Sequence, residues 1–239
     1  MSYSIILPAY KEAKNLNIII DQIQRHMKNK VFEIIVVDDF SDDGTEKILK
    51  KKQKKYKNLN FFLRKFADKS LAKSIFKGIT LSKNKNVIVM DSDFNHKPKD
   101  LKILIEKYEK KKLDFIIGSR FENFKFKNLK FRFILSYFYC IFLSFLLNIK
   151  TSDSLSGFFI LKRNIIKKSF EKKIFYGYGD FFFRLIYFID KKKYLYSSVQ
   201  ITYGERIYGI SKSTFFGLFF KYTFQALKFK IDNYKNRIY

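Results

Sequence analysis

Short apolar runs alternate with segments of helical periodicity along the first half of the chain. The runs that predict buried strands cover residues 3–10, 32–39, 58–65, 85–93 and 113–120. Between them, apolar residues recur every three or four positions, which predicts helices over residues 12–28, within 42–56, and over 70–81 and 98–111. Strands that alternate with helices predict a mostly parallel α/β sheet, with right-handed crossovers and helices on its faces.

Polar side chains gather where the predicted strands end. In parallel α/β sheets, ligands bind at the carboxyl ends of the strands, because these ends meet at one edge of the sheet. We therefore expect the following residues to lie close together: Tyr10, Asp38, Asp39, Asp91, Asp93, Ser119 and Arg120.

The composition of the chain changes after residue 120. Residues 121–149 are basic and then aromatic, a polar segment follows, and residues 194–206 resemble a strand before a basic tail rich in Phe. The uncharged stretch 133–149 predicts a helix that is buried or lies in a membrane interface rather than one that spans. The opening residues lack the pattern of a secretory signal, so we expect a chain on the cytoplasmic side of the membrane.

Composition narrows the classes of partner. The formal net charge is +27, from 49 Lys and Arg against 22 Asp and Glu, which favours an anionic partner such as nucleic acid, acidic lipid or a phosphorylated ligand. Compositional drift on solvated faces explains the same charge equally well. The single cysteine, Cys140, excludes an intramolecular disulfide and cysteine-based zinc sites. No Walker motif and no G-x-G-x-x-G motif occurs, which argues against a P-loop or dinucleotide enzyme.

Two acidic segments at predicted strand ends carry candidate chemistry. Asp91, Asp93 and Asn95 offer oxygen ligands that suit Mg²⁺ or Mn²⁺, and such an ion neutralises a diphosphate leaving group. Asp39 is placed to accept hydrogen bonds from a ribose or a base, whereas Asp43 belongs to a turn that caps the next helix. His96 is expected to be a solvated loop residue.

These segments also carry a resemblance. "PAYKEAKNL", "VVDDFSDDGT", "VMDSDFNHKP" and "GSR" occur in this order and resemble the family 2 glycosyltransferases of the GT-A fold, most of all the dolichyl-phosphate mannose synthase branch. Three later segments are similar to that branch as well, so the resemblance covers about residues 3–213. They are Arg132 with Ser136, Ser152 and Asp153 followed by "SGF", and Arg206 with Gly209, Ser211 and Lys212.

The resemblance implies an architecture and a set of roles. It implies a Rossmann-like GT-A domain over residues 1–213, with a nucleotide-sugar half at about 1–120 and an acceptor half at about 121–213. Residues 214–239 then form a basic, aromatic C-terminal helix, amphipathic and interfacial. The residues implied to hold the nucleotide-sugar are Pro8, Tyr10, Glu12, Asp39, Asp91 and Lys212. Those implied to hold Mg²⁺ or Mn²⁺ are Asp91, Asp93 and Asn95. Those implied to bind an acceptor phosphate are Arg120, Arg132, Ser136 and Arg206. Those implied to act in catalysis are Asp91, Asp93, Arg120 and Arg206.

The implied reaction is the inverting transfer of mannose or glucose from a GDP- or UDP-sugar to a dolichyl or undecaprenyl phosphate. The protein would then be peripheral on the cytoplasmic face of the membrane, alone or with a membrane partner subunit, and would bind no nucleic acid. If the acceptor is instead a sugar hydroxyl, a carboxylate base is required, with Asp153 and Asp180 as candidates. A nucleic-acid-binding protein and a non-catalytic scaffold of the same fold are the alternatives from other classes. Departures from the family pattern, such as Phe40 and Phe159, lie around the expected sugar and acceptor pockets.

Overall fold

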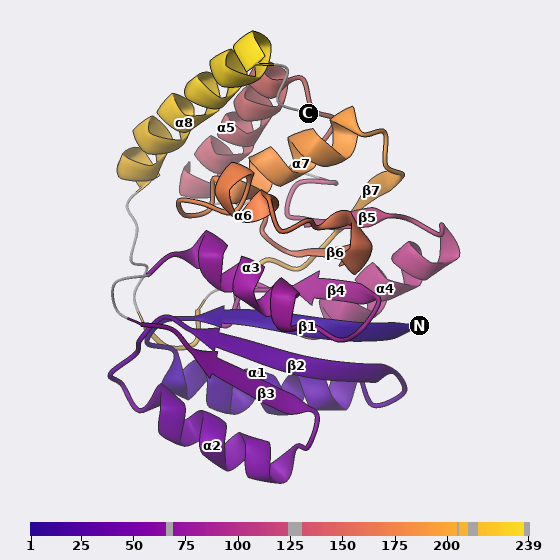
Figure 1. Ribbon diagram of the computed structural model, residues 1–239, viewed down its shortest axis with the longest axis vertical. Helices are drawn as coiled ribbons and strands as arrows, with labels where there is room; N and C mark the ends of the chain where they lie inside the picture. Colours follow the sequence, from indigo (N-terminus) through magenta and orange to yellow (C-terminus); the bar gives the residue numbers. More distant parts are fainter. Residues whose placement is uncertain (66–68, 124–130, 205, 210–214, 237–239) are drawn as a thin grey trace.

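The computed structural model describes residues 1–65, 69–123, 131–204, 206–209 and 215–236. Within these residues one seven-stranded sheet has the order β3-β2-β1-β4-β6-β5-β7 (Figure 1). The strands are β1 (Ser2–Ala9), β2 (Val31–Asp38), β3 (Leu59–Leu63), β4 (Asn86–Val89), β5 (Phe115–Ser119), β6 (Phe159–Lys162) and β7 (Tyr196–Gln200). The helices are α1 (Ala13–His26), α2 (Thr45–Lys55), α3 (Leu71–Leu81), α4 (Asp100–Lys110), α5 (Phe131–Leu147), α6 (Phe170–Lys173), α7 (Phe181–Lys191) and α8 (Phe215–Asn236).

The five strands predicted from the apolar runs are present, and they form the mostly parallel sheet that the sequence predicts. β1 pairs in parallel with β2 and β4, β2 with β3, and β5 with β7. β6 was not predicted, and it lies antiparallel between β4 and β5. In this register Phe159 pairs with Val89, so β6 begins where β4 ends. The segment before β6 therefore reaches the same edge of the sheet as the Asp91 loop.

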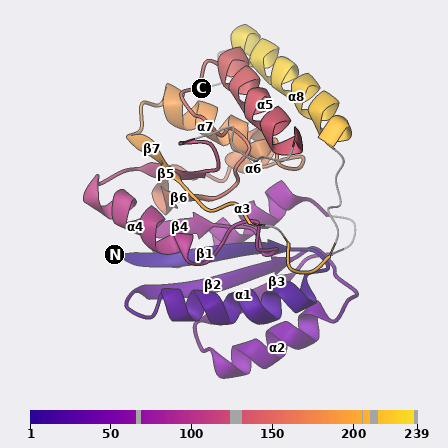
Figure 2. The ribbon, with the colours of Figure 1, turned by 180° about the vertical axis from the view of Figure 1, so that it is seen from behind.

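Successive strand residues face opposite sides of the sheet and build two cores. On one side Ile5 and Leu7 of β1 pack with the apolar residues of α1 and α4. On the other side Ile6 packs with α3, and α5, α7 and α8 extend that core outward. Figures 1 and 2 show the two faces, with α3 on one and α1 and α4 on the other. α3 lies close to β1 because Gly78 has no side chain: a Cβ there would come within 2.4 Å of Ile6 Cγ2.

Helices α5 and α8 lie side by side at one end of the molecule (Figures 1 and 2). The rings of Tyr139 on α5 and Phe219 on α8 are 4.7 Å apart, and the Tyr139 hydroxyl lies 3.1 Å from Thr223 Oγ1. α8 also packs on α7, where the Tyr187 and Phe229 rings are 5.2 Å apart. α8 buries Tyr222, Ala226 and Phe229 but also exposes apolar side chains such as Phe220 and Phe224. The expected domain boundary at residues 213–214 lies outside the described residues. Among the described residues no helix combines the length and the apolar character that crossing a membrane requires.

Candidate functional site

A cleft of about 1490 Å³ opens at the carboxyl ends of the parallel strands. Its lining brings together residues from all three groups that the sequence predicts. The residues of those groups that line it are Pro8, Tyr10, Glu12, Asp39, Asp91, Asp93, Asn95, Arg120, Arg132, Ser136 and Arg206. Lys212 lies outside the described residues. Of the residues expected to converge at the strand ends, five line the cleft, whereas Asp38 and Ser119 are buried and do not line it. The role of each residue stays a prediction.

Three loops of the cleft contain a non-glycine residue with positive φ. Lys11, between Tyr10 and Glu12, has φ 57°; Phe40, directly after Asp39, has φ 61°; and Phe94, directly after Asp93, has φ 70°. Such backbone costs energy in a residue with a side chain, and it gathers at ligand-binding sites where the surrounding structure imposes it. At the position of Phe40 a glycine would adopt the same backbone conformation without this cost.

Asp39 is buried at the end of β2 and its carboxylate is held on both oxygens. Arg64 Nη1 lies 2.8 Å and Ser74 Oγ lies 2.6 Å from Oδ1, and the Ser70 amide donates to Oδ2 at 3.1 Å. Burial raises the pKa of Asp39 above its ordinary value, although the hydrogen bond from Ser74 and the charge of Arg64 oppose this. These contacts fix the direction of a side chain that lines the cleft.

Asp43 serves the turn, as predicted. Its Oδ1 accepts hydrogen bonds from the Thr45 amide and hydroxyl, and its Oδ2 accepts one from the Ala13 amide at 3.0 Å. It thereby ties the start of α2 to the start of α1. Burial alone would raise the pKa of Asp43, but these donors hold it below its ordinary value.

Arg206 bridges two carboxylates at the centre of the cleft. Its Nη2 lies 2.5 Å from Asp93 Oδ2, and its Nη1 lies 3.4 Å from Glu12 Oε1. Asp93 also accepts hydrogen bonds from the amide and the side chain of Asn95, both at 3.0 Å. Desolvation by the surrounding protein raises the pKa of the neighbouring Asp91 to about 6. Among the described residues no group of three His, Cys, Asp or Glu side chains is arranged to hold a metal ion.

His96 is buried, so the expectation of a solvated loop residue is wrong. It is 1% exposed and its ring stacks on Phe158 with 5.0 Å between centroids. The Asp91 amide donates a hydrogen bond to His96 Nδ1 at 3.0 Å. Burial lowers the pKa of His96 to about 4, so the ring is neutral at physiological pH. The polar sequence around it gave no apolar period that could have indicated burial.

The two candidate general bases are both fully engaged with arginines. Asp153 is 0% exposed and binds Arg120 through two contacts, at 2.8 Å to Nε and 2.6 Å to Nη2. Asp180 lies 2.6 Å from Arg184 Nη1, with both side chains almost completely buried, and it accepts a hydrogen bond from the Tyr178 amide. Neither Asp153 nor Asp180 lines the cleft. In this geometry each carboxylate positions an arginine and stabilises the fold. Such a buried, engaged carboxylate does not suit a base that must reach a substrate.

The far end of the cleft is apolar, which the sequence did not predict. Side chains from α3, α5, α7 and α8 form it, including Leu71, Ile75, Phe133, Tyr139, Phe181, Leu218, Phe219 and Tyr222. Leu218 and Tyr222 are one helical turn apart on α8, so the amphipathic pattern of the tail was the available signal. At the other end, sequence reasoning also missed Lys69, whose ammonium lies 3.0 Å from the Tyr10 hydroxyl and 4.2 Å from its ring centroid.

An α/β sheet that is covered on both faces and has a cleft with carboxylates at its strand ends is typical of the nucleotide-binding class of α/β proteins. Within that class, the chain belongs to glycosyl transferase family 2, whose sequence profile matches residues 4–170. It is a glycosyltransferase, as the sequence predicted.

Known proteins with similar sequences agree with this family. An uncharacterized protein of Methanocaldococcus jannaschii is 32% identical over 173 residues, which cover 68% of this chain and 72% of that protein. The dolichol-phosphate mannosyltransferase of Pyrococcus furiosus is 30% identical over 177 residues, 70% of this chain and 48% of that enzyme. The chain thus spans about half the length of that enzyme.

Solved structures confirm the GT-A fold. Glucosyl-3-phosphoglycerate synthase from Mycobacterium tuberculosis, crystallised with Mn²⁺, UDP and glucosyl-3-phosphoglycerate, has a TM-score of 0.67 at 17% identity and covers 97% of this chain and 79% of its own. TarS from S. aureus (residues 1–349) has a TM-score of 0.57 at 18% identity and covers 84% of this chain and 58% of its own. At these identities the likeness shows the fold alone.

Proposed function

We propose that the chain transfers a sugar, mannose or glucose, from a nucleotide diphosphate sugar to a polyprenyl phosphate at the cytoplasmic face of a membrane. The observation that carries this proposal is the two-ended cleft. Its acidic end lies at the strand ends of the sheet, and its apolar end lies against α5 and α8. A lipid phosphate needs both environments, because a charged head and a hydrocarbon tail must be bound at once.

The acceptor phosphate has a matching group of donors between the two ends. Arg132 and Ser136 are one turn apart at the start of α5, and both line the cleft with Arg120. The start of a helix carries partial positive charge and favours anions, and a guanidinium binds phosphate oxygens through two donors. Asp153 holds Nε and Nη2 of Arg120, while Nη1 makes no hydrogen bond within the described residues. We expect this NH2 group of the guanidinium to bind an acceptor oxygen.

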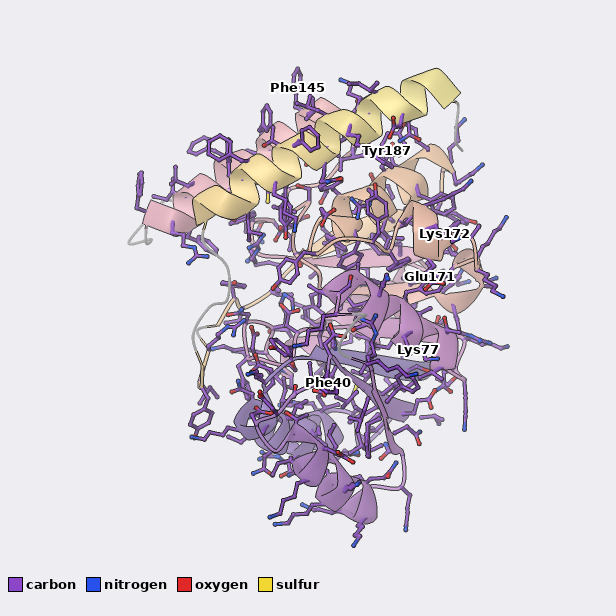
Figure 3. All side chains as sticks on the ribbon, turned by 60° about the vertical axis from the view of Figure 1, so that its left-hand side comes forward. Phe40, Lys77, Phe145, Glu171, Lys172 and Tyr187 are labelled. Carbon is purple, nitrogen blue, oxygen red and sulfur yellow. The ribbon has the colours of Figure 1, made fainter. Side chains whose placement is uncertain are left out.

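The outer faces of α5 and α8 support a membrane-bound acceptor. Their exposed large side chains are Phe131, Phe138, Ile141, Phe142 and Phe145 on α5, and Phe220, Phe224, Leu227 and Ile231 on α8. Phe145, the most exposed of these at 86%, points away from the body of the protein (Figure 3). Exposed Lys221, Lys228 and Lys230 accompany the apolar residues on α8. Aromatic and basic side chains on one pair of helices suit the interface of an anionic membrane.

The donor end fits a divalent ion shared with a diphosphate. Mg²⁺ and Mn²⁺ use one or two protein carboxylates and take further oxygens from substrate phosphates, so Asp91 and Asp93 suffice without a third acid. The M. tuberculosis synthase was crystallised with UDP and either Mn²⁺ or Mg²⁺, which supports the same donor chemistry here. The ion would supply charge neutralisation for the departing nucleoside diphosphate. Asn95 would complete the protein ligands, and Glu12 and Asp39 would hold the nucleoside.

The protein groups then act by alignment and charge. A phosphate acceptor is already ionised at neutral pH and attacks without a base, so inversion at the anomeric carbon requires only that the two substrates lie in line. We expect Arg206, on the segment after β7, to contact donor and acceptor phosphates as negative charge develops on the leaving group. The engagement of Asp153 and Asp180 with arginines favours this acceptor over a sugar hydroxyl, which needs a base.

The test is transfer of labelled sugar into an organic phase. GDP-mannose and UDP-glucose are offered with Mn²⁺ and vesicles that contain dolichyl or undecaprenyl phosphate, and vesicles with the unphosphorylated alcohol are the control. We expect label in the phosphate lipid only, and none with Asp93→Ala. Label in the free alcohol, or in neither lipid, contradicts the proposal.

A separate flotation assay tests the membrane surface. The double variant Phe220→Ser, Phe224→Ser should bind vesicles of anionic lipid less tightly than the wild type, because each substitution removes apolar area from the interface. The matched control, Phe62→Ser, changes an exposed Phe at the end of β3. Equal binding by all three proteins contradicts the assignment of α5 and α8 to the membrane.

A further inference from the structure

We infer that His96 is a positioning residue for sugar transfer: its neutral imidazole holds the backbone of Asp91 in place beneath the donor end of the cleft. The inference rests on the proposed role of Asp91 at the donor diphosphate. His96 itself touches no substrate in this assignment and acts through Asp91.

The first observation is the hydrogen bond to the backbone. The Asp91 amide donates to His96 Nδ1 at 3.0 Å, so Nδ1 must carry a lone pair and the ring proton must lie on Nε2. The backbone of Ser156 also lies beside the ring, where its hydrogen bond raises the pKa of His96 against the larger effect of burial. The imidazole thus contacts two different segments, the loop of Asp91 and the segment of Ser156.

The second observation is what these segments carry. Asp91 belongs to the loop after β4, and Ser156 belongs to the segment before β6, whose Ser156 and Gly157 line the cleft. Ser156 in turn donates to the Gly118 carbonyl at 2.5 Å, at the end of β5. His96 also forms an isolated β-bridge with Tyr203, and the Gly204 amide donates to the Asn95 carbonyl at 2.9 Å. The ring therefore lies where the loop after β4, the segment before β6 and the segment after β7 meet.

The third observation separates positioning from packing. The ring stacks on Phe158, which contributes to the core without any hydrogen bond to the loop. A packing role needs only an aromatic ring at this place. A positioning role needs the Nδ1 lone pair, because without it the Asp91 amide loses its acceptor and the loop is free to turn the carboxylate away from the donor site.

Substitutions that keep one nitrogen at a time distinguish the two roles. His96→Asn places an amide oxygen near the Nδ1 position and preserves the acceptor for the Asp91 amide. His96→Gln places its amide near Nε2 and leaves the Asp91 amide without a partner. His96→Phe keeps the stacking alone, and Phe158→Leu is the matched control that disturbs stacking and leaves both nitrogens.

The readout is binding of Mn²⁺, followed by the electron paramagnetic resonance of the free ion, in the presence of UDP or GDP. We expect His96→Gln and His96→Phe to weaken Mn²⁺ binding about tenfold or more, which is the scale of a buried donor left without an acceptor. His96→Asn should stay within about threefold of the wild type, as should Phe158→Leu. Thermal unfolding of each variant is measured alongside. In transfer assays the loss should appear in the half-saturating metal concentration more than in kcat at saturating metal.

Either of two results overturns the inference. One is equal Mn²⁺ binding by all four variants and the wild type. The other is weakening that follows the loss in melting temperature, with His96→Asn no better than His96→Gln at equal stability. Failure of the proposed function is seen separately, as wild-type Mn²⁺ and nucleotide binding without transfer to a lipid phosphate, and the ranking of the variants then still decides the role of His96. A wild type that binds no Mn²⁺ with either nucleotide overturns both.

Discussion

Arg206 contacts the Asp93 carboxylate to which we assign the divalent cation, so its removal should strengthen metal binding while it weakens catalysis. Its guanidinium contacts Asp93 at 2.5 Å and Glu12 at 3.4 Å, and these side chains are 22%, 7% and 8% exposed. A metal ion that binds Asp93 Oδ2 must displace this contact. The perturbation is Arg206→Gln, which removes the charge and keeps most of the side-chain length.

The magnitude follows from the two contacts. A hydrogen bond between charged groups contributes about 1.5–3 kcal/mol net, and the longer, partly exposed contact with Glu12 adds at most about 1 kcal/mol. Because Arg206 is partly exposed, we take the lower part of this sum, about 2 kcal/mol. That energy corresponds to roughly thirtyfold tighter binding of Mn²⁺ in the variant, measured without nucleotide.

The assay is titration of Mn²⁺ into metal-free protein, with the turnover of each variant measured in parallel. Arg25→Gln is the control, because Arg25 is an exposed residue in the last turn of α1 and its loss changes the net charge equally. We expect tighter Mn²⁺ binding and slower transfer for Arg206→Gln, and neither for Arg25→Gln. Mn²⁺ affinity that is unchanged or weaker in Arg206→Gln would refute the reasoning.

Two further predictions concern buried groups. Asp153→Asn should lower the free energy of unfolding by about 3–5 kcal/mol, because it leaves the Arg120 guanidinium buried without its counter-ion. The measurement is denaturant unfolding. A variant of normal stability that has lost only kcat would restore Asp153 as a general base. The pKa of His96 is about 4 in the folded protein against 6.5 ordinarily, so the unfolded state binds more protons between these values. The stability that His96 contributes is therefore complete above pH 6.5 and falls by about 3 kcal/mol as the pH drops to 4. The raised pKa of Asp91 acts in the opposite direction over part of this range, so the measurement is the difference between wild type and His96→Asn, which should grow smaller at low pH. A difference that does not change with pH contradicts the assignment.

The sheet could be predicted from sequence where the strands are long and buried on both faces. β1 and β2 are eight-residue strands followed directly by polar side chains. The sequence therefore shows both the apolar run of each strand and the position where the strand ends. β6 has only four residues and follows a polar segment, so its apolar run is too short to separate a strand from a helix or a loop. The antiparallel direction of β6 depends on the path of the chain after α5, and no local sequence pattern predicts that path.

The cleft could be predicted only as far as strand ends determine it. Asp39 and Asp91 are placed by the strands before them, whereas their partners come from distant segments. Arg64 lies 25 residues from Asp39 in sequence, and Arg206 lies 194 residues from Glu12. The Asp180–Arg184 pair is the exception, because a spacing of four residues at the start of a helix is a local signal.

The basic composition divides into two kinds of residue with different consequences. Arginines neutralise the acids in and beneath the cleft: Arg206 serves Asp93 and Glu12, Arg64 serves Asp39, Arg120 serves Asp153, and Arg184 serves Asp180. A planar guanidinium with several donors suits such buried pairs, whereas the lysine ammonium is more strongly hydrated and favours exposed positions. Lys221, Lys228 and Lys230 on α8 are exposed in this way. Salt screens exposed charges far more than buried ones. Attraction of α8 to an anionic membrane should therefore weaken at high ionic strength, while the arginine pairs that shape the cleft persist.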